Sequence, residues 1–170
     1  RALTAFEYAL VGWRPVEDQE LRDFAAANAP PTQVVVPGLG LFSYDPRAQW
    51  YEAVLEDPPC KFAVTPLDRV NPTESFERAK QVITGFLPLF PAILEGVARS
   101  QYANWAKNWA DESLSWAEWT ARLKLESITW FAENPVDDYT VWLGDGGLFS
   151  GHSIEVWVKD GAVKSANLAG

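Results

Sequence analysis

The change of hydrophobic period along the chain constrains its fold more than any other feature. Short apolar runs separated by turn residues occupy residues 34–64 and again residues 128–168. Between them, residues 73–123 repeat apolar side chains at the spacing of a helix. A helical block that lies between two blocks of strands predicts an α+β domain, with the helices covering one face of a mainly antiparallel sheet.

The two strand blocks predict a meander of six or seven strands. Turn residues at 45–48 and 57–59 divide the first block into three strands. The second block contains four apolar runs, and Asp160-Gly161 is a strong hairpin signal between the last two. These four runs are residues 128–132, 139–143, 152–158 and 163–168. Short turns between consecutive strands favour antiparallel pairing.

The helical block is expected to form two or three helices. Pro88 and Pro91 should interrupt or kink the first helix, because proline lacks a backbone donor and its ring clashes with the preceding turn. A second helical stretch follows them. Ser115 and Glu118 then have the spacing of a capping box, which predicts the start of a short helix.

The chain is expected to consist of an N-terminal helical extension, residues 1–33, and a single α+β domain, residues 34–170. Pro15 suits the first turn of a helix, and Asn28 with the two prolines that follow suits its end. A length of 170 residues is enough for one domain with a substantial hydrophobic core.

The charge balance restricts the class of partner. The chain has 14 basic and 23 acidic residues, a formal net charge of −9, and its basic residues are scattered. Nucleic acid is therefore not an expected ligand. No segment approaches the roughly 20 apolar residues that span a bilayer, so a membrane is not expected either. The single Cys60 fits a reducing compartment, and we expect a soluble cytoplasmic protein with a basic partner.

A glycine-rich stretch, residues 144–153, contains the only histidine of the chain, His152. Asp145, with Ser150 or Ser153 nearby, supplies the residue types of a Ser–His–Asp hydrolase. His152 shares its strand parity with the aliphatic residues that follow it, which favours a core or turn histidine over a catalytic one. A lone histidine argues against zinc, and the stretch lacks the spaced acids of a calcium loop. We expect no metal and no cofactor.

Four tryptophans lie within fifteen residues of the helical block, among acidic residues that include Asp111 and Glu112. They are Trp105, Trp109, Trp116 and Trp119. Exposed tryptophans are favoured interface anchors, and acidic neighbours suit a basic partner. The alternative is that these side chains pack the helices on the sheet, where each would bury about 150–250 Å². Because four indoles on two short segments are hard to bury completely, these six residues form the candidate binding site.

A second aromatic pair lies on the strands. Trp142 and Trp157 alternate with aliphatic residues, so both should occupy the opposite face of the sheet from those residues. Cross-strand pairing of aromatic side chains explains them structurally. If the N-terminal segment does not cover that face, the pair forms an exposed aromatic patch and a candidate contact surface.

Several blocks carry a family resemblance: residues 40–45, 50–52, 123–128, 144–154 and 166–170. With the order of elements, they resemble a bacterial family catalogued only as domain of unknown function 2262, over about residues 38–170. This chain departs from the family at Gly147, where the family is often acidic, and at Ser150, where it usually has a large aromatic residue. The resemblance brings no established activity. It implies a small cytoplasmic module, and the association of some relatives with bacterial toxin–immunity loci implies, by analogy, a protein-binding role.

Two functions follow from these observations. The first is an acidic macromolecule-binding module, immunity-like or an accessory protein of a bacterial toxin system, that uses the tryptophan cluster. The alternative is a small hydrolase that uses His152 with Asp145 and a nearby serine.

Overall fold

The computed structural model describes residues 19–170. The chain divides into two compact units, residues 1–30 and residues 31–170. The first unit contains the helix α2 (Gln19–Ala27), and the amide group of Asn28 donates to the carbonyl oxygen of Phe24 where this helix ends. Pro15, at which we expected the helix to begin, lies outside the described residues.

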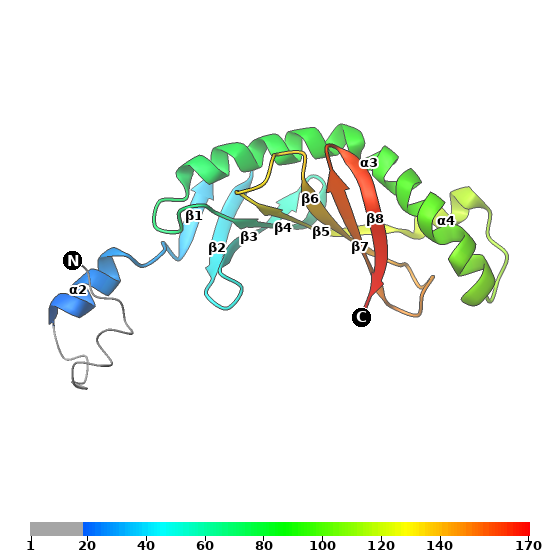
Figure 1. The fold of residues 1–170 in the computed structure, drawn as a ribbon, viewed down its shortest axis with the longest axis horizontal. Helices are drawn as coiled ribbons and strands as arrows, with labels where there is room; N and C mark the ends of the chain where they lie inside the picture. Colours follow the sequence, from blue (N-terminus) through cyan, green and yellow to red (C-terminus); the bar gives the residue numbers. More distant parts are fainter. Residues whose placement is uncertain (1–18) are drawn as a thin grey trace. The chain divides into compact units, whose positions relative to one another are not determined.

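An eight-stranded sheet forms the body of the second unit (Figure 1), and its strands lie side by side in sequence order. They are β1 (Gln33–Val36), β2 (Gly40–Asp45), β3 (Trp50–Glu56), β4 (Pro59–Thr65), β5 (Lys124–Phe131), β6 (Tyr139–Gly144), β7 (Ser153–Lys159) and β8 (Ala162–Ala169). Only β4 and β5 pair in parallel; every other neighbouring pair in this sheet is antiparallel. The predicted α+β class with a mainly antiparallel sheet is confirmed.

The sheet has eight strands rather than six or seven because residues 34–44 form two strands instead of one. Gly38 and Gly40 adopt φ values of +85° and +101°, which glycine tolerates because it lacks a Cβ. The backbone N–H of Leu39 donates to the carbonyl oxygen of Val36 across 3.0 Å. The chain therefore reverses between these two short strands, and β1 pairs with β2.

The helix α3 (Thr73–Asn108) runs unbroken through both prolines, so the second helical stretch that we expected after them belongs to the same helix. With the short helix that follows, the block forms two helices, within the expected two or three. Pro88 and Pro91 lie on the exposed side of the helix, and α3 arches over the sheet (Figure 1). Proline bends a helix away from its own side, and helices that wrap a core are convex toward solvent. The prolines therefore bend α3 along the sheet instead of ending it.

The connection between β4 and β5 consists of α3 and the short helix α4 (Trp116–Arg122). A crossover of this length is what allows that pair of strands to be parallel. The predicted capping box is present: the Ser115 hydroxyl accepts from the backbone N–H of Glu118, and the Glu118 carboxylate accepts from the backbone N–H of Ser115.

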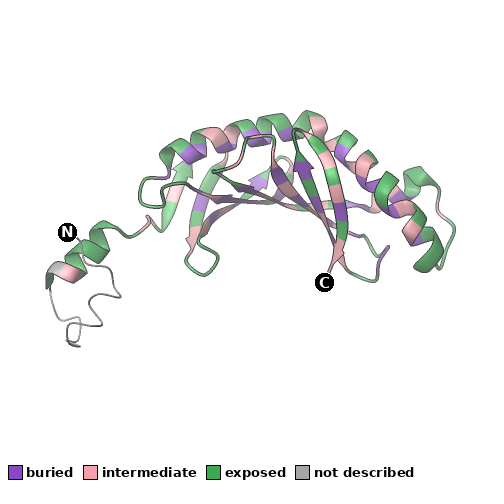
Figure 2. Cartoon of the chain, in the orientation of Figure 1, coloured by how far each residue is buried: buried purple, intermediate pink, exposed green. Residues whose placement is uncertain are grey.

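The core lies between α3 and the facing side of the sheet, where the buried residues concentrate (Figure 2). Arg78 fixes α3 to the loop after β5, because its guanidinium donates to the carbonyl oxygens of Ala132 and Asn134 at 2.6 and 2.8 Å. The same guanidinium lies 5.2 Å from the ring centre of Trp130. These contacts hold the helix in place along the sheet.

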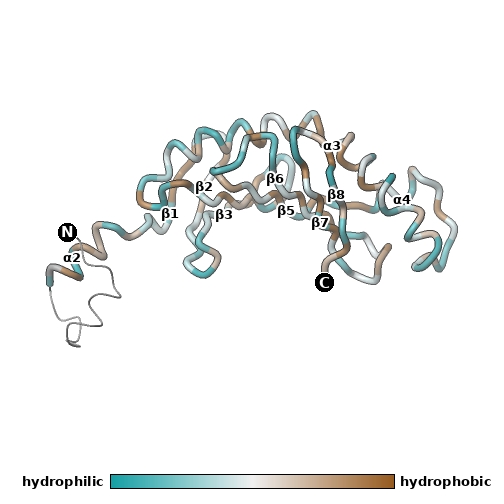
Figure 3. Tube along the Cα trace, viewed as in Figure 1, coloured by the Kyte–Doolittle hydropathy of each residue, from teal (hydrophilic) through white to brown (hydrophobic). Residues whose placement is uncertain are grey.

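By length and composition, α3 is apolar enough to cross a membrane, which corrects our expectation that no segment approaches this limit. Its most apolar window of 18 residues has a mean hydropathy of 1.5, and residues 81–94 carry no charged side chain. Figure 3 shows hydrophobic and hydrophilic residues alternating along α3. One third of that window is buried inside the protein. Its buried side chains belong to the core, and packing on a sheet requires apolar residues only on the side of the helix that faces the sheet.

Candidate functional site

Aromatic side chains from three segments meet at the C-terminal end of α3, in a cluster that we call the aromatic corner. The segments are the last turns of α3, the helix α4 and the glycine-rich loop at residues 145–152. The cluster comprises Tyr102, Trp105, Trp109, Trp116, Trp119, Phe149 and His152. All four candidate tryptophans therefore belong to one structure.

The four tryptophans divide into a buried pair and an exposed pair. Trp105 and Trp119 are 3% and 0% exposed and belong to the core. Trp109 and Trp116 are 37% and 36% exposed. Packing in the core thus describes Trp105 and Trp119, and exposure at the surface describes the other two indoles. The candidate contact surface reduces to Trp109 and Trp116.

The two exposed indoles are connected through a chain of ring contacts. Trp116 contacts Tyr102, and Tyr102 contacts Trp119, with ring centres 5.3 and 6.0 Å apart. Trp119 contacts Phe149 at 6.2 Å, and Phe149 contacts Trp109 at 5.7 Å. Tilted and edge-to-face contacts of this kind are favourable for aromatic rings. The exposed indoles therefore rest on rings that are buried, at Trp119 and Phe149, or half-buried, at Tyr102.

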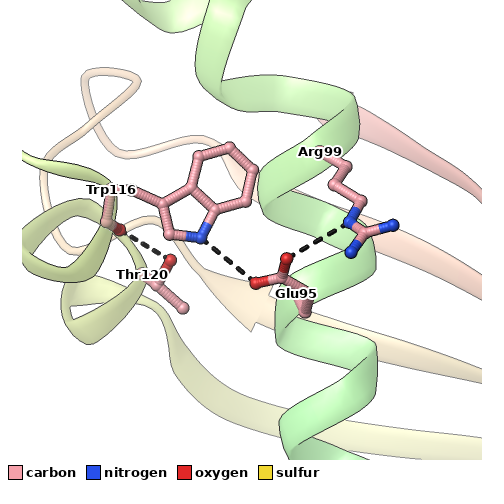
Figure 4. Close-up of polar contacts among 4 residues, drawn as sticks. All are labelled: Glu95, Arg99, Trp116 and Thr120. Carbon is pink, nitrogen blue, oxygen red and sulfur yellow. Dashed lines mark hydrogen bonds and ion pairs between the residues drawn. The ribbon is translucent and has the colours of Figure 1, made fainter.

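A hydrogen bond to α3 fixes the orientation of Trp116 (Figure 4). Its indole N–H donates to one carboxylate oxygen of Glu95 at 3.1 Å, and the other oxygen accepts from the Arg99 guanidinium at 3.2 Å. On α4 itself, the Thr120 hydroxyl donates to the backbone carbonyl oxygen of Trp116. Sequence reasoning did not identify Glu95, because it lies 21 residues from Trp116 and only the packing of α4 on α3 brings them together.

The two candidate acidic residues lie in the segment that joins α3 to α4, and both are exposed. The Glu112 carboxylate forms an ion pair with the Arg122 guanidinium at 2.6 Å. No ion pair within residues 19–170 uses Asp111. On α4, hydrogen bonds from the side chain and backbone of Ser115 lower the pKa of Glu118, which keeps that carboxylate charged.

Asp145 organises the glycine-rich loop. Its side chain is buried and accepts hydrogen bonds from the backbone N–H groups of Gly147, Phe149 and Gly151, at 3.0, 2.6 and 3.0 Å. Burial acts to raise the pKa of Asp145, but these three amides and the electrostatic interaction with His152 outweigh it, so the pKa lies below its usual range. The carboxylate is therefore the acceptor that holds the loop in shape.

The loop also approaches α4 closely. Gly146 has a φ of +57°, and a Cβ at this position would collide with the backbone carbonyl oxygen of Arg122. Glycine thus serves two needs here, the backbone conformation and the close contact between the loop and the end of α4. The loop brings Phe149 under Trp109 and Trp119, a role that the residue pattern alone did not indicate.

The imidazole of His152 is half-buried and packs edge-on against Trp109, with ring centres 5.7 Å apart. Among the described residues, no hydroxyl forms a hydrogen bond with it. Ser150 is exposed and has a φ of +59°. The Ser153 hydroxyl donates to the carboxylate of Glu126 at 3.2 Å. The structure brings His152 near Asp145 and Trp109, but neither serine is bonded to the imidazole.

No protein-family model, curated protein or solved structure matches this chain. The resemblance to the family of domain of unknown function 2262 stays a hypothesis that rests on the sequence blocks. The candidate sites are therefore supported by the set of contacts described above.

Proposed function

We propose that this chain is a binding module that recognises a basic protein partner through the aromatic corner, with Trp109 and Trp116 as the anchors. The observation that carries the proposal is that these two part-exposed indoles stand at opposite ends of one chain of packed rings. Anchors that are already held in place lose little conformational entropy on binding. Tryptophan is also among the residues that contribute most to binding energy at protein interfaces.

The charge of the chain supports a basic partner. The formal net charge is −9, and Asp111 and Glu112 lie exposed on the segment that connects the two anchors. Acidic groups at the edge of an interface accelerate association with a basic protein and contribute less to the strength of the final complex. On the resemblance alone, we extend the proposal to an immunity-like or accessory role in a bacterial toxin system.

The local geometry favours binding over the alternative of a hydrolase. A catalytic triad needs a carboxylate that orients the histidine and a hydroxyl within reach of the imidazole. The Asp145 carboxylate already accepts three backbone hydrogen bonds, and the His152 ring packs on Trp109. These contacts serve the shape of the loop and the support of an exposed indole.

A random peptide library displayed on phage tests the proposal without a known partner. Peptides are selected on the wild-type chain after removal of those that bind the double variant Trp109→Ala/Trp116→Ala. We expect the surviving peptides to be enriched in lysine and arginine. If the removal step leaves no binder, or if the survivors are acidic, the proposal is wrong. Far-UV circular dichroism of the double variant verifies that it is folded.

A further inference from the structure

The face of the sheet that points away from α3 contains a groove of about 450 Å³ over β3 to β7. Its floor is a row of small side chains on neighbouring strands: Ala63 of β4 pairs with Thr129 of β5, which pairs with Thr140 of β6. These residues alternate along their strands with core residues such as Ile128 and Val141, which face α3. The groove therefore runs across the strands on the open face.

Aromatic side chains border this row on both sides. On one side, Phe131 lies two residues beyond Thr129 on β5, and Trp50 lines the same groove from β3. On the other side, Trp142 pairs with Ser127, two residues before Thr129. Two residues of a strand span about 6.6 Å, so the two aromatic borders stand roughly 13 Å apart. This width accommodates one extended chain between the rings.

The charge in the groove is unbalanced. Three glutamates line it, and its one cationic side chain, Lys61, already lies 3.5 Å from the carboxylate of Glu52. The other two are Glu126 and Glu155, and no ion pair within the described part of the chain uses either of them. Among the residues that the structure describes, Glu126 accepts a single hydrogen bond, from the Ser153 hydroxyl. Two carboxylates that line the groove together with aromatic side chains thus have no cationic partner within residues 19–170.

We propose that this groove binds an extended, arginine-rich segment of a partner protein. A guanidinium is planar, stacks on aromatic faces and donates to carboxylates in pairs, so it matches Trp142 together with Glu126 or Glu155. A neutral oligosaccharide would also stack on the rings, but it would leave the carboxylates unneutralised. The groove and the aromatic corner share no residue, so each surface can be tested without the other.

The indole N–H signals of the ¹⁵N-labelled chain provide the test, assigned by single Trp→Phe substitutions. The probe is a hexa-arginine peptide titrated at physiological salt. We expect saturable shifts of the Trp50 and Trp142 signals. The double variant Glu126→Gln/Glu155→Gln should bind at least tenfold more weakly, whereas Glu74→Gln, at an exposed acid in the first turn of α3, should bind as the wild type does.

Several outcomes would overturn this proposal. One is that hexa-arginine shifts only the signals of Trp109 and Trp116, which would support the aromatic corner alone. Another is that Glu74→Gln weakens binding as much as the double variant does, which would indicate unspecific attraction. A third is that cellohexaose shifts the groove signals and hexa-arginine does not. Broadening of these signals when the free protein is concentrated would instead assign the groove to a second copy of the chain.

Discussion

The indole N–H of Trp116 lies 3.1 Å from the carboxylate of Glu95, so the first residue of α4 is bonded directly to the middle of α3. The same carboxylate binds Arg99, and the Trp116 ring rests on Tyr102, also from α3. The hydrogen bond and the ring contact together orient a tryptophan that is still partly exposed. A side chain held in this way is already in position for a partner.

The first prediction concerns this bond. Glu95→Ala removes the acceptor, and we expect the free energy of unfolding to fall by about 0.5–1.5 kcal/mol, the usual contribution of a hydrogen bond. Glu95→Gln keeps an oxygen that can accept the indole N–H and should cost less. Urea denaturation measures both values. Arg99→Ala is the control, because it removes the ion pair but leaves the indole bond. If Arg99→Ala lowers the free energy of unfolding as much as Glu95→Ala does, the ion pair accounts for the loss and the indole hydrogen bond contributes no stability.

The second prediction concerns the buried centre of the ring chain. Trp119 is fully buried, and its indole N–H has no acceptor among the residues that the structure describes. Trp119→Ala should lower the free energy of unfolding by about 3–5 kcal/mol, because it leaves a cavity. Trp119→Phe should cost clearly less, since it keeps a ring and also removes an unpaired buried donor. Equal losses for the two variants, measured by urea denaturation, would show that the ring contacts do not stabilise this corner.

The third prediction concerns pH and Asp145. Its pKa is lowered in the folded chain, so its stabilisation is complete above the ordinary aspartate value of about 3.9 and is lost as the pH falls through the lowered pKa. The unfolded chain binds the proton first, and the free energy of unfolding therefore decreases below about pH 4.

Asp145→Asn removes this titrating carboxylate. A comparison of the variant with the wild type therefore separates the effect of Asp145 from that of the other carboxylates. The difference in the free energy of unfolding between wild type and variant should shrink as the pH falls below about 4. Urea denaturation at several pH values measures it. A difference that stays constant down to pH 2 would mean that the charge of Asp145 does not hold the loop.

The fourth prediction compares two glycines of the loop. Both Gly146 and Gly147 have a positive φ, so an alanine at either position carries a conformational cost of about 1 kcal/mol or more. At Gly146 the new Cβ also collides with the backbone of Arg122, whereas at Gly147 it meets open space. Gly146→Ala should therefore lower the midpoint of thermal unfolding more than Gly147→Ala. The reverse order would mean that the loop does not contact α4 as closely as described.

The fold class was predictable because hydrophobic period and turn chemistry are local properties. The change of period at residues 73–123 and the capping box at Ser115 both correspond to observed elements. Strand alternation also placed Trp157 correctly, since it is 59% exposed on the face away from the core. The same alternation could have placed Trp50 on that face, because it precedes the buried Tyr51.

Other features depend on contacts between distant segments. Whether Pro88 and Pro91 end α3 depends on which side of the helix faces the sheet, and the prolines themselves do not determine this side. Likewise, Trp119 is buried because Phe149 and Tyr102 cover it, whereas Trp109 meets Phe149 at the protein surface. Both residues are tryptophans of the same helical block, so residue type alone could not separate them.

The affinity of a peptide selected for the aromatic corner tests the central claim most directly. Isothermal titration calorimetry gives its dissociation constant for the wild type and for Trp109→Ala, Trp116→Ala and Trp157→Ala. An anchor at an interface centre contributes about 2 kcal/mol or more, so each of the first two substitutions should weaken binding by about 30-fold or more. Trp157→Ala, on the open face of the sheet, should leave the constant unchanged. The account is contradicted if the two corner variants bind the peptide as tightly as the wild type, or if Trp157→Ala weakens binding as much as they do.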